Sequence, residues 1–191
     1  MTAAMWIGRS RPSRSCTAGG TPTRYQLAPG SVPADRDARL EARGYAREAE
    51  SIVMTADLAC AAGPIPGRPV ALAPDADPRW AATWWAFDRG AAAPPALMAI
   101  LRGAHGSLAH AILHADGKVG SVGRGNVDDG WLGVFAMATR PDRRRQGLAA
   151  AVLGALTEWG TKQGATTAYL QVDAHNHAAQ ALYRAAGFSE A

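Results

Sequence analysis

Residues 140–156, RPDRRRQGLAAAVLGAL, constrain the fold of this chain more than any other segment. Four arginines occupy the first six positions, and Gly147 then precedes an alanine- and leucine-rich run with helical spacing. The residues just before the loop, WLGVFAMAT at 131–139, are apolar and typical of a strand. The sequence therefore predicts a strand, a tight basic loop and a long helix in succession.

Three roles are compatible with this basic loop: a solvated turn, a nucleic-acid contact and a phosphate site. Arginine content alone favours the solvated turn, because short basic runs occur widely by chance. A nucleic-acid site usually needs a broad basic face with stacking aromatics, whereas the tryptophans fall mainly on helix faces predicted to be buried. A phosphate could instead accept hydrogen bonds from the unpaired amides of the first helical turn, where Gly147 and the small Ala149 and Ala150 leave room.

The overall composition is that of a globular chain. Its 191 residues are 48% hydrophobic and 19% charged, which is enough to support a core. All basic residues except Lys118 and Lys162 are arginine, which is most simply a coding bias. The net charge of +4 favours anionic partners in general without identifying one.

Cysteine usage and hydropathy indicate a cytoplasmic protein. Cys16 and Cys60 lie far apart without a CxxC pair, so we expect neither a disulfide framework nor a zinc site. No apolar run approaches the roughly 18 to 20 residues of a membrane span, and the basic start of the chain lacks the apolar stretch of a secretory signal. We expect no bound metal and no membrane contact.

The first third of the chain predicts little structure of its own. Residues 1–22 lack periodicity, so we expect them to be disordered. A partial α/β segment follows at 23–68, with a strand at 23–28, a helix at 33–45 and a β-rich run at 50–58. Gly and Pro mark the rest of this segment, from residue 60, as a linker.

Residues 69–191 show stronger patterns. Helices are predicted at 77–90, capped by Asp77, and at 94–103; two strands then flank the Asp116-Gly117 turn. A strand at 131–139, the helix from Gly147, a strand at 165–172 and a helix at 176–188 complete the order. In the last helix we expect an inward face made of Ala178, Ala181, Leu182 and Ala185.

Two motifs in this second part resemble the signatures of the GNAT superfamily of N-acetyltransferases. The first, Arg/Gln-x-x-Gly-x-Gly/Ala, is matched by Arg144, Gly147 and Ala149. The second, Asn-x-x-Ala-x-x-Leu-Tyr-x-x-x-Gly-Phe, is matched by Asn176, Ala179, Leu182, Tyr183, Gly187 and Phe188. The resemblance covers about residues 70–191. It implies an α/β fold with a central mixed, mostly antiparallel sheet flanked by helices.

The resemblance also implies an activity: transfer of an acetyl group from acetyl-CoA, as cosubstrate, to a primary amine of unknown identity. The pyrophosphate would bind backbone amides of Arg144, Arg145, Gln146, Gly147, Leu148, Ala149 and Ala150. The pantetheine arm would pair with Met137, Ala138 and Thr139. Asn176 would contact this arm or simply cap its own helix, since Asn is a favoured N-cap.

Tyr183 is the candidate catalytic acid, because a phenol can protonate a departing thiolate. No general base is identified: the strand 131–139 has no acidic residue, and Asp128 and Asp129 are expected to be turn residues. His110 and His114 would share a face, but without a third ligand they predict no metal site. The acceptor could be a small molecule or a peptide, and a homodimer stays open. The alternative function is an acyl-CoA-binding regulatory or structural module without turnover.

The resemblance is incomplete at the end of the chain, which stops three residues after Phe188. Relatives usually continue with further strands, so we expect a GNAT domain that lacks them. Residues 33–58 loosely resemble the closing helix and strand of another GNAT unit. The chain would then be a remnant of a tandem GNAT protein; the other explanation is that it is a fragment.

Overall fold

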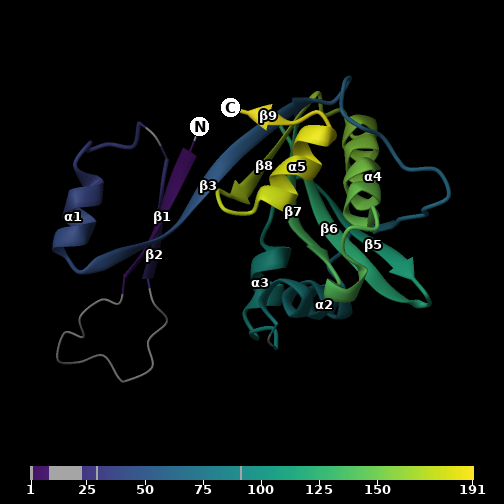
Figure 1. Cartoon of the computed structure of the whole chain (residues 1–191), viewed down its shortest axis with the longest axis horizontal. Helices are drawn as coiled ribbons and strands as arrows, with labels where there is room; N and C mark the ends of the chain where they lie inside the picture. The colour runs from purple at the N-terminus through teal and green to yellow at the C-terminus, as the bar shows by residue number, and fades with distance from the viewer. Residues whose placement is uncertain (1, 9–22, 29, 91) are drawn as a thin grey trace. The chain divides into compact units, whose positions relative to one another are not determined.

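The computed structural model describes residues 2–8, 23–28, 30–90 and 92–191 (Figure 1). The chain divides into two compact units. The smaller unit comprises residues 1–54, 171–180 and 190–191, and the larger unit comprises residues 55–170 and 181–189. Each unit is described separately below.

The larger unit is built on a mixed sheet. Its strands are β4 (Ala71–Ala73), β5 (Ser107–Ala115), β6 (Lys118–Asp128), β7 (Trp131–Thr139) and the first part of β8 (Thr167–Asp173). They lie in the order β8-β7-β6-β5-β4. All neighbours are antiparallel except β7 and β8, which are parallel. The expected mixed, mostly antiparallel sheet flanked by helices is confirmed.

Local turn chemistry sets the register of the two hairpins. Asp116 and Gly117, between β5 and β6, have φ values of 52° and 71°. Asp129 and Gly130, between β6 and β7, have φ values of 46° and 76°. Two successive positive φ angles define the tight turn that matches the right-handed twist of strands, and Asp-Gly is a favoured pair for it. Both turns lie where the sequence predicts them.

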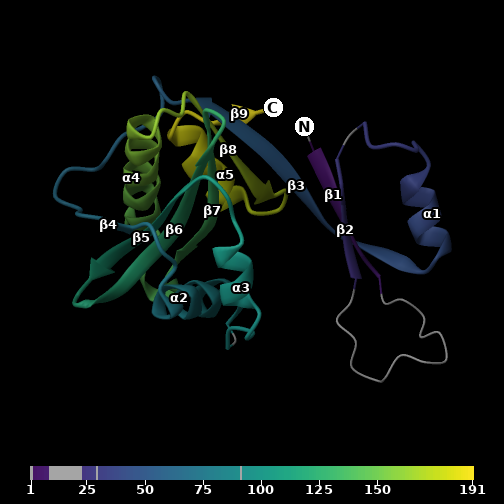
Figure 2. The same ribbon diagram turned by 180° about the vertical axis from the view of Figure 1, so that it is seen from behind.

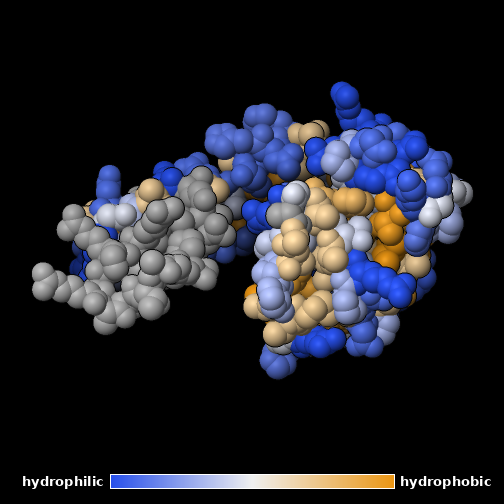
Figure 3. Space-filling model, turned by 90° about the horizontal axis from the view of Figure 1, so that it is seen from below, coloured by the Kyte–Doolittle hydropathy of each residue, from blue (hydrophilic) through white to orange (hydrophobic). Residues whose placement is uncertain are grey.

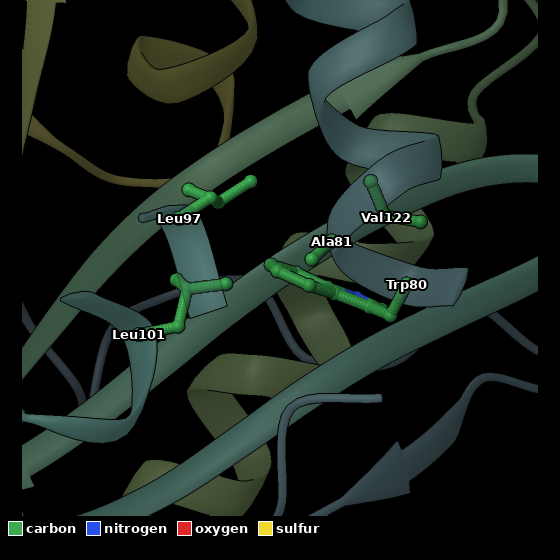
Figure 4. Close-up of a cluster of buried hydrophobic side chains, with 5 residues drawn as sticks. All are labelled: Trp80, Ala81, Leu97, Leu101 and Val122. Atoms are coloured by element: carbon green, nitrogen blue, oxygen red, sulfur yellow. The ribbon is translucent and has the colours of Figure 1, made fainter. Parts of the chain in front are cut away.

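Helices α2 (Pro78–Arg89) and α3 (Leu97–Arg102) pack together against the sheet. The Asp77 side chain caps α2 by accepting a hydrogen bond from the Arg79 amide at 2.6 Å, as the sequence predicts. Figure 4 shows the core cluster between these elements, in which side chains of both helices and of β6 point toward one another. Its members are Trp80, Ala81, Leu97, Leu101 and Val122.

Helix α4 (Leu148–Lys162) packs on the opposite face of the sheet, where β6 has three glycines, Gly120, Gly123 and Gly125. A Cβ added at Gly123 would lie 2.7 Å from Val152 Cγ1, and one added at Gly125 would lie 2.9 Å from the Trp159 ring. Both distances are too short for real contacts, so the glycines let α4 approach the sheet closely. Figures 1 and 2 show α4 running along the sheet, with α2 and α3 side by side near its first turn.

The segment predicted to be a linker packs closely against α4. The Thr157 hydroxyl of α4 donates to the Ala62 carbonyl at 2.9 Å, and the Ala62 amide donates to the Ala186 carbonyl at 3.0 Å. A Cβ added at Gly154 would lie 2.7 Å from the Gly63 carbonyl carbon, so α4 and the backbone of Gly63 are in close contact. This segment is therefore a packed part of the larger unit.

The smaller unit contains β1 (Thr2–Gly8), β2 (Thr23–Leu27), helix α1 (Arg36–Ala42) and β3 (Tyr45–Asp57) as far as residue 54. The strands lie in the order β2-β1-β3 and are antiparallel. The structure thus differs from the expectation of disorder for residues 2–8, because β1 gains backbone partners on both sides that local sequence does not reveal. Residues 9–22 lie outside the described residues.

The remaining elements are α5 (His177–Ala185) and the two-residue strand β9 (Ser189–Glu190). The buried face of α5 carries Gln180 and Tyr183, while Ala178, Ala181 and Ala185 are exposed, so the expected inward face is wrong. The side-chain amide of Gln180 explains why a different face of α5 points inward, since it donates to the carbonyls of Asp173 and Ala174 at 3.2 and 2.9 Å. Alanine spacing gave no signal for these polar contacts.

On the right-hand body in Figure 3, hydrophobic residues gather in a patch and hydrophilic residues surround it. Large apolar side chains that stay exposed include Ile100, Trp131 and Phe135. Within the described residues, no helix combines the length and apolar character needed to cross a bilayer.

Candidate active site

Strand β7 loses one of its two partners half-way along. Residues 131–134 lie opposite residues 167–170 of β8, and the parallel pairing ends there. On the other side the register with β6 shifts, and Ala136 has a positive φ of 52°. An extra residue of this kind is a β-bulge, which bends the strand and increases its twist. Within the described part of the larger unit, residues 135–139 therefore have no strand partner on the β8 side.

Two arginines fix the start of the basic loop to the sheet. The Arg140 Nε donates to Asp142 Oδ1 at 2.7 Å, and its Nη1 donates to the Val119 carbonyl at 3.4 Å. The Arg144 Nε donates to the Thr139 carbonyl at 3.4 Å. The hydrogen bond from Arg140 lowers the pKa of the Asp142 carboxyl. These guanidinium groups stabilise the loop itself.

Arg143 ties the loop to a neighbouring hairpin, because it forms an ion pair with Asp116 in the β5–β6 turn. Arg145, which has a φ of 58°, forms no hydrogen bond or ion pair with any described residue. The guanidinium of Arg145 is thus the one in this loop that is open to a ligand, as far as the described residues show. The sequence alone does not distinguish the four arginines. In the structure, Arg140, Arg143 and Arg144 hold the loop, and Arg145 is available to a ligand.

The start of α4 presents a row of free donors. The amides of residues 145–150 donate to no acceptor among the described residues, and the amide of Ala151, which donates to the Gly147 carbonyl at 3.0 Å, is the next in the chain. Gly147 has a φ of 76°, and a Cβ added to it would meet no atom within 4 Å. The helix dipole adds partial positive charge at this end. The geometry suits an anion with several acceptor oxygens.

Asn176 caps α5, because its Oδ1 accepts the Ala179 amide at 3.1 Å. The capping role that the sequence allows is therefore present, and it uses the side-chain oxygen. The buried Gln180, which fixes the turn before α5, is a residue that sequence reasoning missed. Its position four residues after the Asn cap does not identify it as buried, since many exposed glutamines share this spacing.

Tyr183 is 7% exposed and its ring lies 6.1 Å from that of Phe188. Its carbonyl accepts the amides of Ala186 and Phe188, both at 3.0 Å, which closes the end of α5. Gly187 between them has a φ of 95° that favours glycine, which explains the Gly-Phe pair of the second motif. Burial raises the pKa of the Tyr183 phenol to about 12, so the hydroxyl keeps its proton at neutral pH.

The two histidines of β5 differ in burial. His110 is 2% exposed, lies edge-on to Trp80 with ring centroids 4.8 Å apart, and is opposite Arg124 in β6. Burial, and then the charge of Arg124, lower the pKa of His110, while Asp75 acts in the opposite sense. His114 is exposed. Among the described residues, no group of three or more His, Cys, Asp or Glu side chains is placed to hold a metal ion.

Comparison of the sequence with known families gives a match over residues 26–191 to the family described as "Probable histone acetyltransferase Rv0428c C-terminal". The chain belongs to this family. The match includes both motifs, the basic loop and the bulged strand.

One curated relative of this chain is the ribosomal protein bS18-alanine N-acetyltransferase of Escherichia coli K12, which is 47% identical over 58 residues. The aligned region covers 30% of this chain and 39% of that protein. The chain thus spans about two fifths of the length of the curated relatives it matches.

Solved structures of GNAT acetyltransferases share the fold. The crystal structure of the E. coli ribosomal-protein-S18-alanine N-acetyltransferase has a TM-score of 0.53 and 28% identity, covering 64% of this chain and 79% of that chain. A GNAT-family acetyltransferase from Colwellia psychrerythraea has a TM-score of 0.56 at 23% identity, covering 75% and 53%. AAC(6')-Iy in complex with a CoA-containing bisubstrate analog has a TM-score of 0.50 at 21% identity, covering 64% and 92%. The predicted GNAT fold is confirmed.

Proposed function

We propose that this protein transfers the acetyl group of acetyl-CoA to a primary amine. The observation that carries the proposal is the row of free amides at residues 145–150, at the start of α4 and directly after the bulged strand β7. Family membership and the GNAT fold support the same reading. Acetyl-CoA would supply an acetyl thioester, an activated acyl group, when bound.

The pyrophosphate of the cosubstrate fits the amides of residues 145–150. A side chain at position 147 would fill the space in which the phosphate oxygens would lie, and Gly147 leaves that space open. Arg145 adds a guanidinium that no other described residue engages. Arg144 contributes by holding the loop through the Thr139 carbonyl.

The pantetheine arm fits the half of β7 that β8 does not pair with. Backbone groups of Met137, Ala138 and Thr139 on this edge would hydrogen-bond the arm as an additional strand would. A main-chain amide just after the bulge would stabilise negative charge that develops on the thioester oxygen. Asn176 uses Oδ1 to cap α5, which leaves its side-chain NH2 group as the donor available to a ligand.

Tyr183 would donate the proton that the thiolate leaving group takes up. The hydroxyl is protonated at neutral pH, as a general acid requires; because burial raises its pKa to about 12, it would share its proton with the thiolate in the transition state and keep it in the resting enzyme. β7 has no acidic side chain to act as a base, so the proton of the amine would leave through a water relay, or the amine would bind already neutral. The E. coli relative is named for an alanine of ribosomal protein bS18, which makes a peptide amine the first acceptor to try. We place this reaction in the cytoplasm.

Calorimetric titration with acetyl-CoA tests the cosubstrate site. Gly147→Glu places a carboxylate among the free amides and should abolish the micromolar binding expected of the wild type. Gly164→Glu is the matched control: Gly164 follows α4 at its other end, has a φ of 89°, and likewise has no atom within 4 Å of an added Cβ. The two variants impose similar backbone strain, so equal loss of binding would contradict the assignment.

Thiol release during incubation with amines tests turnover separately. A wild-type protein that binds acetyl-CoA and releases thiol only when an amine is present would support the transferase. Binding without release from any amine would instead support an acyl-CoA-binding module, for which the absence of an acidic side chain on β7 is the specific argument.

A further inference from the structure

Three aromatic side chains form an open surface beside the bulge, which we call the aromatic shelf: Trp131 and Phe135 of β7 and Tyr169 of β8. The Tyr169 ring lies 6.2 Å from that of Trp131 and 5.8 Å from that of Phe135, both edge-to-face. Trp131 is 46% exposed and Phe135 is 39% exposed. Large aromatic side chains are usually buried far more than this, so the exposed shelf requires an explanation.

The shelf lies on the sheet face opposite α4. Leu132, which alternates with the shelf residues, packs against Gly160 of α4. Phe135 lies opposite Arg124, whose Nη2 donates to the Leu101 carbonyl of α3 at 3.0 Å. The shelf is therefore on the same face as α2 and α3, at a part of the sheet where its rings stay accessible.

Gly133 determines how the shelf is built. A Cβ added there would lie 2.7 Å from Phe135 Cζ and 3.0 Å from the Tyr169 hydroxyl. The Phe135 ring consequently lies across the bare backbone of Gly133 and meets Tyr169. Any side chain at position 133 would displace this ring, so the aromatic shelf depends on the glycine.

One end of the shelf is next to the proposed reaction centre, because Phe135 directly precedes the bulge residue Ala136. The other end, Trp131, is four residues earlier, or about 13 Å along an extended strand. Asp128 lies opposite Trp131 in the register, so both side chains are on this face. Asp128 is exposed, and no described residue forms an ion pair or hydrogen bond with its carboxylate.

We propose that the aromatic shelf and Asp128 bind the acetyl acceptor as an extended peptide segment, an inference that rests on the proposed function. The reacting amine would lie beyond Phe135, an apolar side chain would pack on the rings, and a basic side chain would reach Asp128 and Trp131. A cation gains from both the carboxylate and the face of an indole ring. The acceptor would thus need a positive charge more than about 13 Å from its reacting nitrogen.

The openness of the shelf favours a peptide over a small amine. Sites for small molecules are concave and enclose most of the ligand. Two cavities among the described residues, of about 600 and 470 Å³, are lined by other residues than the shelf: one lies between residues 64–72 and α4, the other beside Asp75, residues 106–108 and Trp159. An extended chain can instead gain its affinity from several side chains along an open strand.

Steady-state kinetics with three defined acceptors tests the inference. The probes are a hexapeptide of glycine, leucine and arginine with a free α-amine, the same peptide with arginine replaced by glutamate, and glycinamide. We expect the wild type to prefer the basic peptide over glycinamide in kcat/KM. Trp131→Ala should raise the KM for the basic peptide at least tenfold, and Asp128→Asn should reduce the difference between the basic and acidic peptides. Neither change should alter acetyl-CoA binding.

Leu72→Ala is the matched control, since Leu72 of β4 is an apolar side chain of similar exposure, 38%, away from the shelf. Equal KM effects of Trp131→Ala and Leu72→Ala, or a wild type that prefers glycinamide or a polyamine such as spermidine, would overturn the shelf proposal while leaving acetyl transfer intact. Conversion of a dimer to a monomer by Trp131→Ala, measured by sedimentation, would also overturn it, because the shelf would then bind a second copy. Failure of the proposed function would be seen separately, as absence of thiol release with every amine.

Discussion

Replacing Gly154 with alanine tests how α4 is attached to the segment before β4. Alanine has a higher helix propensity than glycine, which by itself should stabilise α4 by about 1 kcal/mol. The added Cβ would, however, lie 2.7 Å from the Gly63 carbonyl carbon and 3.1 Å from the Pro64 nitrogen. These are backbone atoms that cannot move aside as a flexible side chain does. Forcing extra volume into such a contact costs about 1–3 kcal/mol.

The segment cannot shift freely, because the Ala62 carbonyl accepts the Thr157 hydroxyl at 2.9 Å and the Ala62 amide donates to Ala186 at 3.0 Å. Moving it would weaken hydrogen bonds worth about 1 kcal/mol each. We therefore expect Gly154→Ala to lower the free energy of unfolding by about 1–3 kcal/mol in total. The midpoint of thermal unfolding should fall by about 3–10 °C.

Circular dichroism at 222 nm during thermal and urea unfolding provides the assay. Gly63→Ala is the control: it adds the same methyl group to the other partner of the contact, where an added Cβ meets nothing within 4 Å. Its stability should stay within about 0.5 kcal/mol of the wild type. A Gly154→Ala variant more stable than the wild type would refute the reasoning, because helix propensity would then outweigh the close approach.

Three further predictions concern the candidate site. Tyr183→Phe should lower turnover about 10²–10⁴-fold with unchanged acetyl-CoA binding by calorimetry, and unchanged turnover would refute the acid role. Asp116→Asn, which removes the partner of Arg143, should raise the KM for acetyl-CoA about two- to fivefold; Asp129→Asn, at the same position of the next turn, should not, and equal effects would count against the loop being held through this pair. Because burial lowers the pKa of His110, its stabilising contribution is present above about pH 6.5 and lost as pH falls through its folded value. Urea unfolding from pH 8 to pH 5 should therefore show a decline that His110→Leu reduces, and an unchanged decline would contradict this assignment.

Local chemistry made several features of the fold predictable from sequence. The Asp-Gly pairs at 116–117 and 129–130 determine their turns through the φ angles that only a few residues adopt easily. Asp77 followed by proline marks the start of α2 for a similarly local reason. The two GNAT motifs combine such signals with fixed spacing, so the family and the fold followed from them.

The site was only partly predictable, because side-chain partners far apart in the sequence decide its details. The run of arginines indicates an anion site, yet which guanidinium stays available depends on Asp116 and Thr139, which the loop meets only in the folded sheet. The inward face of α5 was misjudged for the same reason, since Gln180 is drawn inward by carbonyls at the end of β8. The spacing of apolar residues along the chain gives no sign of such contacts.

By itself, the sequence determined the order of the helices and strands from α2 to α5, though not the short strands β4 and β9, together with the Asp-Gly turns and the helix start that suits a phosphate. Each of these features depends on residues close together in the chain. Only the tertiary structure decided where β7 loses its parallel partner and which arginine of the loop has no partner in the described part of the chain. It also decided how Gly133 leaves room for the Phe135 ring, and that His110 is buried against Trp80. Those features arise from packing between distant segments. The energy of such packing depends on residues far apart in the sequence, so local sequence patterns do not reveal it.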